Sequence, residues 1–278
     1  MFISTANKVS TKIVRQELQY DRQAIARIKN IIAISSGSGR VGKNVIAVNT
    51  AVSLAQMGLK VGLLDADPNS TNARDILGLK HSYLPVSDEK YEPVNNFGVK
   101  LVSFASLNEA ESLESCGDNW LDPTVSQIIE RVAWGDLDYL LVNLPPGIGE
   151  LQLALARILT FDNVIMIATS RNTQTDTYET LKMFEQLQVP IIGLIENMSD
   201  KIAPGLPKRK CEIRGGEKLR SKIRIPYLGY IPLDRKVSEY SDRGLPIVLT
   251  EPGSLFASAL NTIVWAIVSK TTIASLKF

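Results

Sequence analysis

The stretch IIAISSGSGRVGKNVIAVN, residues 31–49, constrains the fold more than any other part of the chain. A short run of β-branched and apolar residues leads into a glycine-rich segment, and a helical pattern follows at once. A strand, a tight loop and a helix in this order can gather the backbone N–H groups of the helix N-terminus around an anion. The same order also fits a turn that only packs the helix against the strand.

The glycine spacing fits two phosphate-binding motifs. Gly37, Gly39 and Gly42 satisfy the spacing GxGxxG. Asp65 ends the next apolar run about 20 residues later, as in nicotinamide-dinucleotide sites. The same segment fits GxxxxGK, in which Lys43 would reach the β- and γ-phosphates of ATP. Lys43 favours the ATP loop, and the loop by itself leaves all three alternatives open.

Alternating strand and helix patterns predict an α/β fold. Short apolar runs begin at residues 31, 60, 99, 138, 163, 190 and 227, and helical patterns cover 44–57, 122–134, 149–160 and 173–187. Buried strands that alternate with helices predict a mostly parallel sheet of about seven strands with helices on both faces. We expect an N-terminal arm over residues 1–29 and one P-loop nucleotide-binding domain over residues 30–278.

Composition removes several classes of protein. Thirty-one basic and 29 acidic residues give a net charge of +2, far from the surplus of a dedicated nucleic-acid binder. The single histidine, His81, leaves no material for a histidine-based triad. The apolar run at residues 263–268 is shorter than the roughly 20 residues of a membrane span. We expect a soluble, cytoplasmic protein, with an organelle matrix or stroma as the alternative because the first 16 residues lack acidic side chains.

Segments downstream of the loop decide between the motifs. LLDADP ends the second predicted strand, and LLVNLPPGIGE carries a turn that a γ-phosphate sensor could use. With WGDLDYLLVN, VPIIGLIENMS, GGEKL, YIPLDRKV and RGLPIVL, these segments resemble the Mrp family, of the Mrp/NUBP type. This family lies within the MinD and ParA group of deviant P-loop ATPases. The resemblance covers residues 31–268 in the family's order and implies a P-loop NTPase-type sheet.

The resemblance implies a homodimer that sandwiches two ATP molecules and hydrolyses them slowly. It also implies an iron–sulfur cluster carried across the dimer through a CxxC pair. By position, Lys43 and Asp67 are the catalytic residues, and Asp67 positions the attacking water. The residues that would hold the phosphates are Gly37, Ser38, Gly39, Arg40, Val41, Gly42, Lys43, Asn44 and Val45.

The same resemblance places the metal and the base. Asn44, Asp65 and Asn143 occupy the magnesium side of the site, and carboxylate oxygens suit this cation. Asn197 and the backbone around Pro232 would receive the adenine, because a neutral amide suits the edge of a base.

Four residues depart from the family's phosphate site, whose loop reads GKGGVGKS. Ser38 replaces the signature lysine that reaches the partner's nucleotide, and Arg40 either supplies that charge or blocks the approach that glycine permits. Asn44 fits the octahedral shell of Mg²⁺ poorly, and Asn143 lacks the negative charge of the Walker B aspartate. Each loss on the metal side costs about 3 kcal/mol of transition-state stabilisation. We therefore expect weak Mg²⁺ binding and slow or absent hydrolysis.

The cluster site departs further from the family pattern. Ala203 and Leu206 stand where the family has its two cysteines, and neither side chain can ligate iron. Cys211 would give two thiolates per dimer, fewer than the four of a conventional cluster. We expect no iron–sulfur cluster in this protein, with Cys116 and Cys211 as thiols that bind no iron.

Four functions are compatible with these patterns. The first is an ATP- or ADP-binding protein of iron–sulfur cluster assembly, with weakened hydrolysis, that works as a homodimer or heterodimer with assembly or client proteins. The second is a pseudo-ATPase that acts as a dimer partner without chemistry. The third is a MinD- or ParA-like positioning ATPase, and the fourth is a nicotinamide enzyme. We expect neither nucleic acid nor a membrane span.

Overall fold

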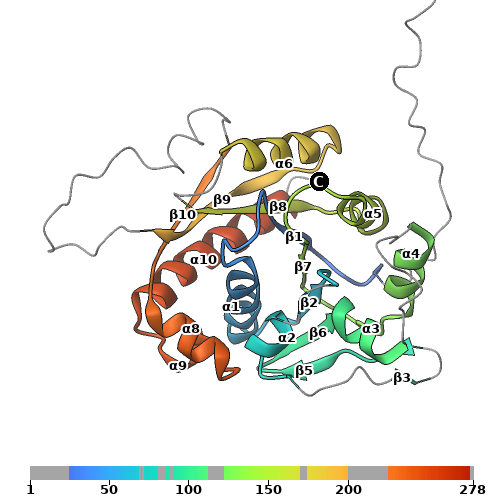
Figure 1. Ribbon diagram of the computed structural model, residues 1–278, viewed down its shortest axis with the longest axis horizontal. Helices are drawn as coiled ribbons and strands as arrows, with labels where there is room; N and C mark the ends of the chain where they lie inside the picture. The colour runs from blue at the N-terminus through green and yellow to red at the C-terminus, as the bar shows by residue number, and fades with distance from the viewer. Residues whose placement is uncertain are drawn as a thin grey trace, which may run out of the picture.

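The strand and helix patterns produce one large sheet in the computed structural model, which describes residues 25–68, 70, 72–80, 86–87, 90–111, 122–169, 174–199 and 225–275 (Figure 1). The strands of this sheet are β1 (Ile31–Ser36), β2 (Val61–Asp65), β5 (Val94–Asn96), β6 (Val99–Ser103), β7 (Tyr139–Asn143), β8 (Asn163–Thr169), β9 (Ile191–Ser199) and β10 (Tyr227–Pro232). Their order is β10-β9-β8-β1-β7-β2-β6-β5, and the short strands β3 (Val86–Ser87) and β4 (Lys90–Tyr91) pair separately.

The predicted parallel sheet is confirmed. β1 lies at its centre, paired in parallel with β7 on one side and β8 on the other. The antiparallel strand is β5, which closes the edge beside β6. The sequence analysis missed β5 because its three residues, VNN, contain no apolar run.

Helices cover both faces of the sheet, as predicted. One core cluster lies under α3 (Phe104–Glu111), α4 (Asp122–Arg131), α5 (Glu150–Leu159) and α6 (Gln174–Gln186). The second lies under α1 (Lys43–Gln56), α2 (Asn72–Ile76), α9 (Ile247–Thr250) and α10 (Leu255–Ser275). The helix α8 (Arg235–Asp242) packs against α2 and α9. With helices on both sides, the strands are buried on both faces, which explains their continuous apolar runs.

The C-terminal helix α10 belongs to the core. Within the described residues it is the one helix long and apolar enough to cross a membrane, over Leu255–Ile273. Its stripe of Phe256, Leu260, Ile263, Val264 and Ile267 is buried in the second cluster, and the helix packs against β10 and α1. These residues therefore form part of the core, while Val268 is only partly buried.

The end of the predicted N-terminal arm joins the domain. Ile28 forms a parallel bridge with Leu137, and the Lys29 ammonium donates to Asp138 at 2.8 Å. Residues 25–29 thus pack beside the start of β7, so the described chain meets the core before the predicted boundary at residue 30. The remainder of the arm lies outside the described residues.

Candidate functional site

The glycine loop joins the carboxyl end of β1 to the first residue of α1. Gly42 caps α1 with φ 77°, a left-handed conformation that glycine adopts without strain. A side chain at Gly37 would collide with the backbone of Thr177 at the start of α6. Gly39 has open space around it. Two of the three glycines are therefore required by geometry, one by its backbone angle and one by a close approach.

A buried polar network lies below this loop. Lys43 is 7% exposed, and its ammonium donates to Asn143 Oδ1 at 2.7 Å and to Asn44 Oδ1 at 3.2 Å. The Asn143 amide donates to Asn44 Oδ1 at 2.9 Å and to Asp65 Oδ1 at 2.8 Å. The Asn44 amide donates to Ser70 Oγ at 3.2 Å. The first residues of α1 and the ends of β2 and β7 are thus joined by side chains.

Burial shifts the pKa values of both ionisable residues in the network, and in each case it favours the uncharged form. Asp65 is completely buried, and this raises its pKa from 3.8 to about 7, although the bond from Asn143 and the charge of Lys43 oppose the shift. Burial lowers the Lys43 pKa from 10.5 to about 8, against the attraction of Asp65 and Asp67. The site holds a carboxyl group and an amine that both change charge close to neutral pH, a condition common at functional sites.

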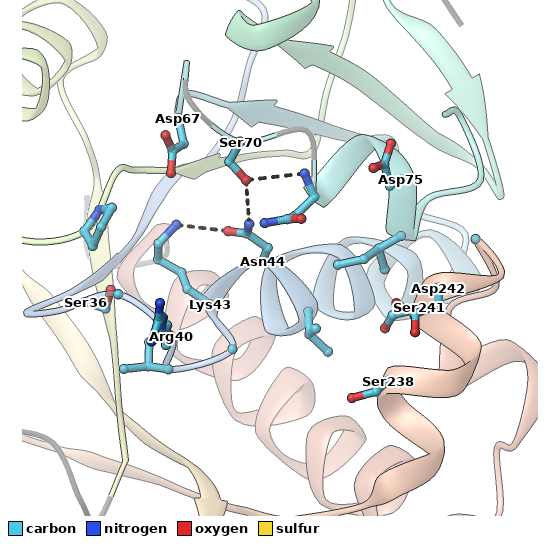
Figure 2. Close-up of a pocket in the computed structure, with 18 of the residues that line it drawn as sticks. Ser36, Arg40, Lys43, Asn44, Asp67, Ser70, Asp75, Ser238, Ser241 and Asp242 are labelled. Carbon is cyan, nitrogen blue, oxygen red and sulfur yellow. Dashed lines mark hydrogen bonds between the residues drawn. The ribbon is translucent and has the colours of Figure 1, made fainter. Parts of the chain in front are cut away.

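A cavity of about 900 Å³ opens above the network. Its lining includes the loop, the start of α1, Asp67 and Ser70 after β2, and Pro146 after β7 (Figure 2). The cavity also extends along α2 to Ser238, Ser241 and the end of α8. At the loop, the N-terminus of α1 and the Lys43 side chain border the same part of the cavity, and this combination suits a bound anion.

Arg40 is the unusual residue of the loop. Its φ of 61° is left-handed, which costs a residue other than glycine about 1 to 2 kcal/mol. The residue is exposed and lines the cavity. Figure 2 shows its side chain at the loop, with the nitrogen end directed toward the space between Ser36 and Lys43. A strained residue that faces a cavity invites a functional explanation.

Most of the predicted phosphate-site residues line the cavity. These are Ser38, Gly39, Arg40, Val41, Gly42, Lys43, Asn44 and Val45, together with the predicted catalytic residue Asp67. Gly37 contributes by its packing against α6, and Asp65 and Asn143 lie in the buried network below. Ser70 was missed, since its only signal was its position shortly after the second strand.

The two residues predicted to receive the base lie elsewhere. Asn197 is buried on β9, and its amide donates to the Val41 carbonyl at 2.8 Å. Pro232 ends β10 and pairs with Ser199. Neither lines the cavity. Their predicted role stays a prediction, and the observed role of Asn197 is to anchor the loop to β9.

The predicted magnesium residues fit the shell of a divalent cation poorly in this structure, and their role in metal binding stays a prediction. Mg²⁺ requires near-octahedral oxygen ligands, usually with one or two carboxylates. Here the amide oxygens of Asn44 and Asn143 accept hydrogen bonds from the Lys43 ammonium. Asp65 and Asn143 lie outside the cavity lining. The described residues contain no group of three or more His, Cys, Asp or Glu that could hold a metal. The predicted cluster positions Ala203 and Leu206, and the thiols Cys116 and Cys211, lie outside the described residues.

Sequence comparison finds relatives over most of the chain. Residues 27–268 match the ParA family model described as NUBPL iron-transfer P-loop NTPase. An iron–sulfur cluster carrier protein of Synechocystis sp. is 40% identical over 277 residues, which cover 97% of this chain and 78% of the relative. The Arabidopsis thaliana protein named "Iron-sulfur protein required for NADH dehydrogenase, mitochondrial" is 34% identical, covering 84% of this chain and 75% of the relative.

Structural comparison gives the same fold. A nucleotide-binding protein of Archaeoglobus fulgidus, solved in complex with ADP, superimposes with a TM-score of 0.69 and 29% identity, covering 82% of this chain and 91% of the other. The MinD cell division protein of Aquifex aeolicus gives a TM-score of 0.64 with 23% identity, covering 86% and 97%. The MinD similarity concerns the fold alone.

Proposed function

Because the chain belongs to the ParA/NUBPL family of iron-transfer P-loop NTPases, we propose that it binds ATP or ADP between β1 and α1 and serves iron–sulfur cluster assembly. The family membership confirms the resemblance to the Mrp family and removes the nicotinamide alternative. Relatives are named iron–sulfur cluster carrier proteins, and the Archaeoglobus structure contains ADP. Membership in a P-loop NTPase family implies binding of a nucleotide with Mg²⁺.

One observation carries the nucleotide proposal. The Lys43 ammonium is held at the N-terminus of α1, at the floor of a cavity of about 900 Å³. A cation and a helix N-terminus on one cavity attract the same ligand, a phosphate chain. The cavity volume lies within the range of about 300 to 1,000 Å³ that is typical of small-molecule sites.

Weakened hydrolysis is part of the proposal. Asn143 replaces the aspartate of the family motif, and its amide oxygen is bonded to Lys43 at 2.7 Å. An amide attracts a cation less than a carboxylate does, so the developing charge on the phosphates is stabilised less. We expect phosphate release to be about a hundredfold slower than in a relative with the complete motif. Phosphate release at the rate of such a relative would contradict this part.

We also propose a dimer without a cluster of its own. Ile148 and Leu233 are 52% and 62% exposed, and both follow strand ends at the edge that carries the cavity. Exposed apolar side chains beside the site suit a homodimer or heterodimer interface. Sedimentation velocity with and without nucleotide tests for the dimer. A monomer under both conditions would contradict this proposal. A stable cluster after anaerobic reconstitution would contradict the expectation from Ala203 and Leu206.

A pseudo-ATPase that acts as a dimer partner is the second candidate. The amides at Asn44 and Asn143 favour it, because they occupy two of the three predicted positions on the metal side. A MinD- or ParA-like positioning role has support only from the shared fold. For the compartment we propose the cytoplasm, or an organelle matrix or stroma, since relatives include bacterial proteins and one named as mitochondrial. Cell fractionation tests this placement.

Calorimetric titration with ATP and with ADP tests the nucleotide proposal. The wild-type protein should bind both nucleotides, and Lys43→Met should lose most of the affinity because it removes the buried cation. Lys60→Met is the control, since Lys60 is an exposed lysine before β2, at the opposite edge of the sheet. Absence of binding by the wild type would overturn the nucleotide proposal. Binding with rapid magnesium-dependent turnover would overturn the pseudo-ATPase alternative.

A further inference from the structure

We infer that this chain neutralises nucleotide phosphates with two of its own side chains, Lys43 and Arg40, in place of a divalent cation. Nucleotide binding should therefore be independent of Mg²⁺. The inference rests on the proposed nucleotide binding, and it concerns positions at which this chain differs from the motif GKGGVGKS.

The first argument is the state of the oxygens on the metal side. Asn44 Oδ1 accepts from Lys43 and from Asn143, at 3.2 and 2.9 Å, and Asn143 Oδ1 accepts from Lys43 at 2.7 Å. A divalent cation would have to compete with an ammonium group for these oxygens. Two cations cannot share them without strong repulsion, since like charges a few ångströms apart in a buried site repel strongly.

The second argument concerns the carboxylates. Asp65 is fully buried and lies outside the cavity lining, so a cation held between the phosphates would not reach it. One oxygen of Asp65 already accepts from Asn143 at 2.8 Å. Asp67 remains as the carboxylate near the loop that lines the cavity. One carboxylate and an occupied amide oxygen are a poor set for the octahedral shell of Mg²⁺.

The third argument is that Arg40 provides a second positive charge beside Lys43. The described residues provide no hydrogen bond or ion pair for the Arg40 guanidinium, although it borders the same cavity as Lys43. Its backbone is held at φ 61°, a strained conformation for a residue other than glycine, and such strain at a cavity points to a functional reason for the arginine. A guanidinium can bind two phosphate oxygens at once, and it is always charged.

The two cations would differ in what they contact. Lys43 lies at the floor of the cavity and is fixed by two amide oxygens, so it suits the inner phosphates. Arg40 lies at the exposed rim of the loop, so it suits the terminal phosphate. Because ATP carries one more phosphate than ADP, loss of Arg40 should weaken ATP binding more than ADP binding.

Titration calorimetry with ATP and with ADP, each in excess Mg²⁺ and in excess EDTA, tests the inference. For the wild type we expect affinities that agree within about twofold between the two conditions. Arg40→Gly should weaken ATP binding in EDTA by about tenfold or more, with a smaller effect on ADP. Arg40→Lys should recover part of the loss because the charge remains. Lys60→Gln removes a positive charge just before β2, at the end of the strands far from the cavity, and this variant should bind as the wild type does.

The Arg40→Gly variant should fold, because glycine adopts a positive φ without strain. A wild-type protein that binds nucleotide only with Mg²⁺ would overturn the inference and leave the proposed function intact. Unchanged ATP affinity of Arg40→Gly in EDTA would also overturn it. Absence of nucleotide binding by the wild type under both conditions would instead refute the proposed function.

Discussion

At the residue scale, the network around Lys43 shows how burial sets the charges of a site. Lys43, Asn143 and Asp65 come from three different elements, and the two charged groups do not bond directly to each other. Asn143 stands between them, accepting from the ammonium at 2.7 Å and donating to the carboxyl group at 2.8 Å. An amide can satisfy both neighbours at once because it has a donor and an acceptor.

The pKa shifts of this network predict how stability depends on pH. The folded-state pKa of Asp65, about 7, lies above the ordinary value of 3.8 expected when the chain is unfolded, so its stabilising contribution is full below pH 3.8 and lost as pH rises through 7. The contribution amounts to at most about 4 kcal/mol. Lys43 has a lowered pKa of about 8, so its contribution is full above pH 10.5 and lost as pH falls through 8. The two groups together predict a minimum of stability near pH 7 to 8.

Urea unfolding between pH 4 and pH 10 measures this dependence. Asp65→Asn keeps the size of the side chain and an acceptor for Asn143, so it should flatten the decrease between pH 4 and 7. Asp136→Asn is the control, because Asp136 is exposed and pairs with Arg27 at the surface. An equal decrease in Asp65→Asn and the wild type would refute the assignment to Asp65.

At the element scale, the phosphate loop is shaped by its neighbours. The start of α6 presses against Gly37, and β9 holds the loop through the bond from Asn197 to Val41 at 2.8 Å. The loop is therefore positioned by two elements that lie far from it in the sequence. Its three glycines differ in their structural importance, although they look equivalent in the motif.

A pair of glycine substitutions tests this difference. Gly37→Ala should lower the free energy of unfolding by about 1 to 3 kcal/mol, because the new methyl group would collide with the backbone of Thr177. Gly39→Ala should leave it unchanged or raise it by up to about 1 kcal/mol, since nothing lies near that position. Denaturant unfolding of both variants makes the comparison, and equal effects would show that α6 does not constrain the loop.

At the scale of the whole molecule, α10 completes the core on one face of the sheet. It is long and apolar enough to cross a membrane, yet the helix packs against β10 and α1. Buried apolar side chains on a helix face of this kind provide a large part of a domain's stability.

Two substitutions on α10 distinguish a core helix from a membrane helix. Phe256 is 2% exposed, so Phe256→Ala should destabilise the protein by about 3 to 5 kcal/mol. Trp265 is 63% exposed, so Trp265→Ala should change the free energy of unfolding by less than about 0.5 kcal/mol. Thermal and denaturant unfolding measure both. A large effect at Trp265 with a small one at Phe256 would contradict the packing of α10.

The sequence by itself determined the alternation of strands and helices, the position of the glycine loop and the family. These depend on local periodicity, on glycine conformations and on short motifs, which are properties of neighbouring residues. The sequence analysis missed β5 because one valine and two asparagines at a sheet edge make no apolar run. Arg40 was recognised as a departure from the motif, but its effect could not be deduced.

Only the tertiary structure decided which side chains meet. Lys43 and Asn143 are 100 residues apart, and they touch because β1 and β7 are adjacent parallel strands whose ends share one edge of the sheet. The same edge brings Asn197 to Val41, 156 residues away. The Asn197 amide, which was predicted to receive the adenine, therefore anchors the loop in this structure. Contacts of this kind depend on strand order, which the local pattern of a sequence does not specify.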